Sequence, residues 1–378
     1  MEKYDGSQII EPTLIRSPYM KKIDLYIIKK FLGTFFYAIS LLIIVVIIFD
    51  VSEKVDDFLD RNAPFRAIVF DYYFNFIPYF VNLFLYLFTF ISVIFFTSRM
   101  ASNTEIIAIL SSGVSFKRML RPYILSALFL TVMSLALSNF VIPRTNERLV
   151  DFEKNYLHTP RKDRANNIHM QADSVSYYYI KSFNAKTNEG KDFTFEKANP
   201  DRGMFYRLNA EKIAYNPETE IWTLSDYKIR RIHKFGEYIT RGMTLDTTLK
   251  LTPSDFTVVI EDMKVMNYME LKEFIEVEKE KGVRNMKKFE VEQHKRMAFP
   301  FATVILTLLG VSLSSRKVRG GMGMHLGIGI GLTFLFILFM QVSTVFATNG
   351  SLSPLLAAWL PNIIYSFIAA YLLYKAPK

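Results

Sequence analysis

The sequence predicts a polytopic α-helical membrane protein with six transmembrane helices and an all-β domain inserted between the third and fourth helices. Three observations support this prediction: apolar runs long enough to cross a bilayer, one long polar insert that divides them three and three, and strand-like alternation within the insert. A chain that is 51% hydrophobic and 22% charged fits spans combined with a solvated domain.

Six apolar runs have the length, roughly 17–25 residues, that a helix needs to cross about 30 Å of hydrocarbon. They cover residues 31–50, 72–97, 122–142, 297–314, 324–347 and 354–374. The first run follows a polar leader and lacks a small-residue cleavage site, so we expect a retained helix. The aromatic residues of the second run fit either lipid-facing positions or the lining of an acyl-chain cavity.

Basic residues of the short loops set the expected orientation. They precede the first run, separate the second from the third and the fourth from the fifth, and follow the sixth, which places them on one side of the membrane. They are Lys21, Lys22, Lys29, Lys30, Arg99, Lys117, Arg118, Arg121, Arg316, Lys317, Arg319, Lys375 and Lys378. Because short cytoplasmic loops are rich in Lys and Arg, we expect both termini in the cytoplasm and the insert outside it. The net charge of +10 therefore indicates topology rather than nucleic-acid binding.

The polar insert separates an N-terminal half, residues 1–142, from a C-terminal half, residues 297–378. Residues 143–268 are expected to form the β domain, a sandwich or open barrel, and residues 269–296 a connecting helical segment. The predicted strands are residues 174–180, 193–195, 207–215, 221–224, 227–232 and 245–251.

A short amphipathic helix is expected at about residues 102–113, on the cytoplasmic side. The Ser-Asn-Thr stretch at its start offers capping side chains, and Gly113 ends the helix. Its apolar face is expected to consist of Ile106, Ile107, Ile109 and Leu110. Glu105 either complements the helix dipole or pairs with an arginine of a partner.

Glycines recur every four residues along the fifth run, at Gly323, Gly327 and Gly331. Small residues at this spacing let two helix backbones approach closely. The stripe fits packing within the chain or a contact with another subunit.

Signatures of an energy-converting or catalytic centre are absent from the sequence. It contains no phosphate-binding P-loop motif, no H-E-x-x-H, no cysteine, and five histidines without ligand spacing. We therefore expect no cofactor, no metal site and no enzyme activity in this chain, with the energy supplied by a separate protein.

Four sequence stretches together point to a known family. They are Ile23-Asp24-x-Tyr26-Ile27, Asn103-Thr-Glu105-Ile-Ile-Ala108 with Ser112-Gly113, Lys212-Ile-Ala-Tyr215 to Trp222-x-Leu224, and Ser353-Pro354 to Trp359-Leu-Pro361-Asn362. Over nearly its whole length the chain resembles the lipopolysaccharide-export permeases (LptF/LptG, the YjgP/YjgQ family).

This resemblance implies a multi-pass protein of the inner membrane of a Gram-negative bacterium, with a periplasmic jellyroll-like β domain. It implies an ABC-type exporter: a second permease subunit of the same family, a cytoplasmic LptB-like ATPase dimer, and periplasmic jellyroll bridge proteins of the LptC/LptA type that receive lipopolysaccharide. The first and fifth spans then form a lateral gate, with roles for Gly323, Gly327 and Gly331. The ATPase-coupling residues are expected to be Glu105, Ile106, Ala108, Ile109, Ser112 and Gly113.

The sequence departs from the enteric members at the outer rim of the first span, where those carry lysines that meet lipid phosphates. Here the rim is acidic, with Asp50, Asp56 and Asp57. The candidate lipid contacts are therefore Lys54, Arg144 and Arg148. Two alternative functions are a mechanotransmitter of the lipoprotein-release or macrolide-export type and an envelope scaffold that transports nothing. The former carries its periplasmic domain after the first of four spans.

Overall fold

Six helices long and apolar enough to span a membrane are present in the computed structural model, which confirms the predicted number. The structure describes residues 22–157, 164–173, 175–184, 187–199, 203–233, 236–249, 251–253, 263–280, 286–315, 321–350 and 352–376. Several predictions fall outside these residues: the basic residues Lys21, Arg316, Lys317, Arg319 and Lys378, and segments 254–262 and 281–285 of the predicted β domain and connecting segment.

The helices extend well beyond the apolar runs. They are α1 (Lys22–Asp60), α2 (Phe65–Ala67), α3 (Phe74–Ser102), α4 (Glu105–Ser111), α5 (Phe116–Ala136), α6 (Ile142–Tyr156), α7 (Tyr268–Glu280), α8 (Met286–Ser314), α9 (Gly321–Asn349) and α10 (Pro354–Lys375). π-Helical segments Ile68–Tyr73 and Leu137–Val141 join α2 to α3 and α5 to α6, giving continuous helical rods. The third rod thus continues to Tyr156, past the predicted end at residue 142.

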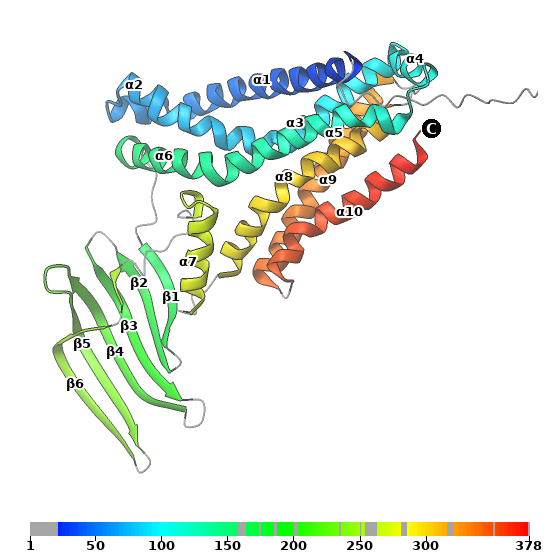
Figure 1. The fold of residues 1–378 in the computed structure, drawn as a ribbon. Coiled ribbons are helices and arrows are strands. Elements are labelled where there is room, and N and C mark those ends of the chain that lie inside the picture. The colour runs from blue at the N-terminus through cyan, green and yellow to red at the C-terminus, as the bar shows by residue number, and fades with distance from the viewer. Residues whose placement is uncertain are drawn as a thin grey trace, which may run out of the picture.

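Helix α3 lies at the centre of the helical part. It packs against α1 in one apolar core and against α8 and α9 in another, while α10 covers α8 and α9 (Figure 1). Helix α4, the start of α1 and the end of α10 gather at one end of the long helices, and the β-sheet lies beyond the other end (Figure 1). Helix α4 and the β-sheet are therefore separated by the length of the helical bundle.

The six strands form one antiparallel sheet in sequential order, between the third and fourth spans. They are β1 (Arg164–Asp173), β2 (Ser176–Asn184), β3 (Glu189–Asn199), β4 (Gly203–Asn216), β5 (Ile221–His233) and β6 (Gly236–Thr247). The predicted all-β domain is confirmed, but β1 was missed and β5 was divided into two strands, 221–224 and 227–232. The last strand was predicted at residues 245–251 and overlaps β6 only at residues 245–247.

A crease across the sheet explains the divided strand. Within each of β2 to β5, two consecutive residues that are not buried interrupt the alternation of buried residues. In β6 two exposed residues lie between the half-buried Gly242 and Leu245. The strand register continues unshifted on both sides of these pairs. These pairs are Lys181-Ser182, Lys191-Asp192, Glu211-Lys212, Ser225-Asp226 and Met243-Thr244. Asp192 and Asp226 adopt left-handed backbone conformations, with φ of 53° and 50°. The buried face shifts by one residue at this line, so the sheet bends around its apolar side.

The bent sheet encloses its own core. Ile180, Ile213, Trp222 and Leu224 are fully buried although the described strands form one sheet rather than two facing layers. The Trp222 indole donates to the carbonyl oxygen of Leu251 at 2.9 Å, which holds the segment after β6 across this face. The predicted arrangements were a sandwich and an open barrel. The described strands form a single sheet, which fits the open barrel better than the sandwich.

Candidate functional site

Helix α4 is anchored by one isoleucine. Ile106 is 2% exposed and packs in the core that includes Met100, Phe116 and Met119. Gly113 follows the helix with φ of +83°, a conformation suited to glycine, so the predicted helix end is confirmed. The predicted cap is wrong: Thr104 stands at the N-cap with φ of 62°, and its hydroxyl donates to the Asn103 carbonyl instead of capping the helix.

The outward face of α4 is only partly the one expected. Of the predicted coupling residues, Ala108, Ser112 and Gly113 are exposed, Ile109 is half-buried, and Ile106 belongs to the core. Ile107 is 55% exposed beside Ala108 and was missed. The sequence pattern placed Ile107 on the apolar face, and its exposure shows that this prediction was wrong.

Polar contacts tie this end to the first turn of α1. The Tyr26 hydroxyl donates to Glu105 Oε2 at 3.0 Å, and Asn103 Nδ2 donates to Glu105 Oε1 at 3.2 Å. Arg118, at the start of α5, donates through both terminal nitrogens to the buried Asp24, at 2.8 and 2.6 Å. In the sequence alone, Asp24 and Tyr26 stand out only as parts of the Ile23-Asp24-x-Tyr26-Ile27 motif.

The glycine stripe of α9 is an open surface. A Cβ built at Gly323, Gly327 or Gly331 meets nothing within 4 Å among the described residues, and all three glycines are exposed. Gly329, by contrast, packs inward against Ile94. Packing within the chain therefore explains Gly329 but not the stripe.

At the other end of α1, the candidate lipid contact Lys54 is already paired. Its ammonium lies 2.9 Å from Asp50 and over the ring of Tyr72, whose hydroxyl it also contacts. Asp50 in turn accepts hydrogen bonds from the hydroxyls of Tyr72 and Tyr73, at 3.2 and 3.1 Å. Much of the aromatic start of the second span is thereby packed inside the protein, around a neutralised ion pair.

The other two candidate lipid contacts lie on α6 and are exposed. Arg144 and Arg148 make no ion pair or side-chain hydrogen bond with the residues that the structure describes. Of the remaining acidic residues at the rim, Asp56 is exposed and Asp57 is half-buried. The structure thus gives the three candidates different states: Lys54 neutralised, Arg144 and Arg148 available.

The concave face of the sheet is continuous and apolar. Its core residues come from all strands from β1 to β5, with partly buried side chains from β6: Met170, Tyr178, Ile180, Phe183, Phe193, Leu208, Ala210, Ile213, Trp222, Leu224, Ile229 and Leu245. Burial raises the pKa of the Tyr206 phenol, which packs against this core. The side chains of this face match hydrocarbon chains in polarity and offer little to a charged ligand.

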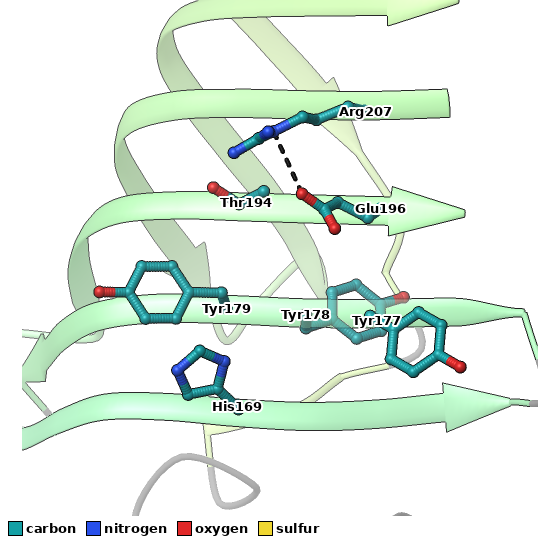
Figure 2. Close-up of a pocket in the computed structure, with 7 residues that line it drawn as sticks. All are labelled: His169, Tyr177, Tyr178, Tyr179, Thr194, Glu196 and Arg207. Atoms are coloured by element: carbon teal, nitrogen blue, oxygen red, sulfur yellow. Dashed lines mark ion pairs between the residues drawn. The ribbon is translucent and has the colours of Figure 1, made fainter. Parts of the chain in front are cut away.

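A pocket of about 290 Å³ is lined by side chains of β1 to β4, including His169, Glu196 and Arg207 (Figure 2). His169 and Tyr179 lie ring to ring at 4.7 Å on neighbouring strands, and Glu196 pairs with Arg207 at 3.2 Å (Figure 2). Tyr177 and Tyr178 both line the pocket, but Tyr177 is 40% exposed, whereas Tyr178 is 5% exposed and packs in the apolar core. Within the described ranges, the acidic and histidine side chains form no cluster of three that could hold a metal ion.

A family model described as Lipopolysaccharide export system permease LptF/LptG matches residues 25–375. This match runs from the first turn of α1 to the last residue of α10, so it includes both groups of helices and the sheet. No curated protein matches the sequence.

Proposed function

Because the chain belongs to the LptF/LptG family of lipopolysaccharide export system permeases, we propose that it is the permease subunit of an ABC-type exporter. In this proposal it extracts lipopolysaccharide from the inner membrane and passes it to a periplasmic bridge. The chain itself is a multi-pass inner-membrane transport subunit rather than an enzyme. The single observation that carries the proposal is the continuous apolar face of the creased sheet, at the opposite end of the helices from α4.

The proposed direction of transport follows from the charges at the α4 end. Arg99, Lys117 and Lys375 lie at the ends of helices there, as expected for the cytoplasmic side. The sheet then lies in the periplasm, where its concave face shields acyl chains from water. We expect the bridge proteins of the LptC/LptA type to continue this apolar path.

The ATPase contact is assigned to the exposed side of α4. Ile107, Ala108 and Ser112 form the docking surface for an LptB-like ATPase dimer, with Glu105 at its edge. Ile106 has a different role in this proposal, because its burial fixes α4 to the bundle. Hydrolysis in the ATPase then moves α4 as a unit with the elements it packs on.

A second permease subunit of the family completes the transport path. The open stripe of Gly323, Gly327 and Gly331 on α9 permits close approach of a helix from that subunit. Helix α1 exposes large apolar side chains, such as Tyr37 and Ile44, along the membrane. We assign α1 of one subunit and α9 of the other to the lateral gate.

The phosphate contacts are assigned to Arg144 and Arg148. Both are exposed on α6, and an arginine matches phosphate oxygens with two donors at once. Lys54 is left out of the assignment because Asp50 already neutralises it in a partly buried site. Lipopolysaccharide phosphates therefore meet this chain at α6 rather than at α1.

Two alternatives predict different observations. A mechanotransmitter of the lipoprotein-release type carries its periplasmic domain after the first of four spans, whereas here the sheet follows the third of six. An envelope scaffold requires no lipid on the concave face.

The experiment that tests the proposal is reconstitution in proteoliposomes with the ATPase, the second permease and lipopolysaccharide. We expect ATP-dependent transfer of lipopolysaccharide to a soluble jellyroll acceptor, and no transfer when ATP is replaced by ADP. Assembly without ATP-dependent transfer to the acceptor would contradict the transport role and favour the scaffold.

A further inference from the structure

The geometry points to a two-point link through which α4 and the start of α5 move α1. The link consists of Tyr26 on Glu105 and Asp24 on Arg118, and Tyr26 and Asp24 act in it as positioning residues. This inference rests on the proposed function, because it assumes that an ATPase displaces α4. It adds what the docking surface alone lacks, namely a path from α4 to the helix assigned to the gate.

Helix α1 is attached to its own chain along one narrow side. Its buried apolar residues fall at intervals of four, as Ile27, Phe31, Phe35, Ile39 and Ile43, and pack on α3 and α5. The opposite side is exposed, with Tyr37 at 73% and Ile44 at 59%. A helix held by one apolar stripe can tilt without breaking interdigitated packing on several sides.

The same helix is long and unbroken, so a displacement of its first turn is carried along its length. It contains 39 residues, which at about 1.5 Å per residue span roughly 58 Å. The far end is held to Tyr72 and Tyr73 by the partly buried Asp50 and Lys54. Displacement at the first turn therefore tilts α1 about this outer attachment.

The first turn is held by groups from two neighbouring elements. Arg118 donates a hydrogen bond to each carboxylate oxygen of Asp24. This bidentate geometry fixes both the distance between the two side chains and their relative orientation. Asp24 is only 6% exposed. The Tyr26 hydroxyl reaches Glu105 at 3.0 Å. Glu105 belongs to α4 and Arg118 to α5, and a short turn connects these two helices. Both contacts therefore come from one helix–turn–helix unit, which lies beside the start of α1 (Figure 1).

The link is tested by distance measurements in the full chain. The chain lacks cysteine, so nitroxide labels at Ile44→Cys on α1 and Phe334→Cys on α9 report their separation, and both sites are exposed. In nanodiscs holding the chain alone, Tyr26→Phe combined with Asp24→Asn should broaden the distance distribution. Tyr37→Phe, which removes an exposed hydroxyl from the same helix, should leave it unchanged. Equal distributions in all three proteins would overturn the link.

The assembled complex supplies the second readout. With a non-hydrolysable ATP analogue, we expect the parent to show a shift in separation and the double variant to lose most of it. ATPase binding and ATP hydrolysis should stay within about twofold. Lipid transfer should fall roughly 5- to 10-fold, in the lower part of the range of ordinary coupling energies. A purely structural defect would lower hydrolysis and transfer together, and that result would also count against the link.

A charge exchange keeps the test decisive if the double variant folds poorly. Asp24→Arg combined with Arg118→Asp restores the pair in reverse and should recover transfer relative to Asp24→Arg alone; no recovery would overturn this contact. Failure of the ATPase to bind the parent would instead contradict the proposed function. The distances measured in the chain alone would still decide the link.

Discussion

We expect substitutions at Glu105 to separate the folding of this chain from its docking on the ATPase. Glu105→Gln keeps an oxygen that can accept from the Tyr26 hydroxyl, so the contact between α4 and α1 survives. It removes the negative charge that an arginine of the ATPase is expected to meet. Glu105→Arg removes both the acceptor for the Tyr26 hydroxyl and the negative charge, and it places a positive charge against the expected arginine of the ATPase.

The expected magnitudes follow from the exposure and contacts of Glu105. Its carboxylate accepts two hydrogen bonds, at 3.0 and 3.2 Å, at the surface of the chain. Losing both costs about 1–3 kcal/mol of folding free energy, which is small beside the burial of Ile106 and its neighbours. Removing one partner of an interfacial charge pair costs about 2 kcal/mol or more, which corresponds to roughly 30-fold in Kd. We expect this for Glu105→Gln, and a larger loss for Glu105→Arg.

The assay is titration of the ATPase onto the permease pair in nanodiscs, combined with ATP hydrolysis and lipid transfer. Glu147→Arg is a suitable control, since Glu147 is exposed on α6, far from α4. It should leave ATPase binding unchanged. Parental binding and transfer in Glu105→Arg would refute the assignment of α4 to the ATPase interface.

The other substitutions probe the α9 stripe and the outer rim. Gly327→Phe should leave the thermal stability of the isolated chain unchanged, because no described atom lies within 4 Å of an added Cβ, yet it should prevent pairing with the second permease in pull-down. Gly329→Phe should destabilise the chain by about 1–3 kcal/mol, because the larger side chain overpacks the core at Ile94. Normal pairing by Gly327→Phe would contradict the open-stripe assignment. Arg144→Gln with Arg148→Gln should weaken lipopolysaccharide binding in a salt-sensitive way, whereas Lys54→Gln should lower the Tm and spare binding, because it leaves a mostly buried carboxylate unpaired. The reverse pattern would return the phosphate contact to α1.

The helical part was predictable because its signal is local. A span needs a continuous apolar run, and all six runs became helices. The ends were missed where amphipathic turns extend the helix, as before residue 31, where Ile27 and Phe31 share the buried stripe. The stretch before residue 31 is too short for its helical spacing to be recognised without knowing the helices it packs against.

The sheet was predictable as strands but not as a shape. Ser225-Asp226 was taken as a break between two strands because two polar neighbours interrupt the alternation, and the recurrence of such pairs at one level in five strands appears only with the register known. Strand β1 was missed because its sequence, RANNIHMQAD, offers few apolar residues. Its hydrogen bonds come from β2, the one strand it pairs with in the described sheet.

The candidate site divides in the same way. Gly113 and the existence of α4 followed from local spacing, whereas the contacts of Tyr26 with Glu105 and of Asp24 with Arg118 join residues 79 and 94 positions apart. The pairing of Lys54 with Asp50 has the helical i, i+4 spacing, but its burial depends on tyrosines from the next helix. These contacts could not be predicted because their partners are distant in the sequence, not because the interactions are weak.

The most direct test of the account uses the neighbouring tyrosines of β2 as paired probes. Tyr178 is 5% exposed and packs in the apolar core, whereas Tyr177 is 40% exposed on the convex side. A photo-crosslinking phenylalanine analogue at either position, in the ATP-driven reconstituted complex, reports which face carries lipid. The account predicts an ATP-dependent lipopolysaccharide adduct at position 178 and little at position 177. Equal adducts at both positions, or none at 178, would contradict transport along the concave face.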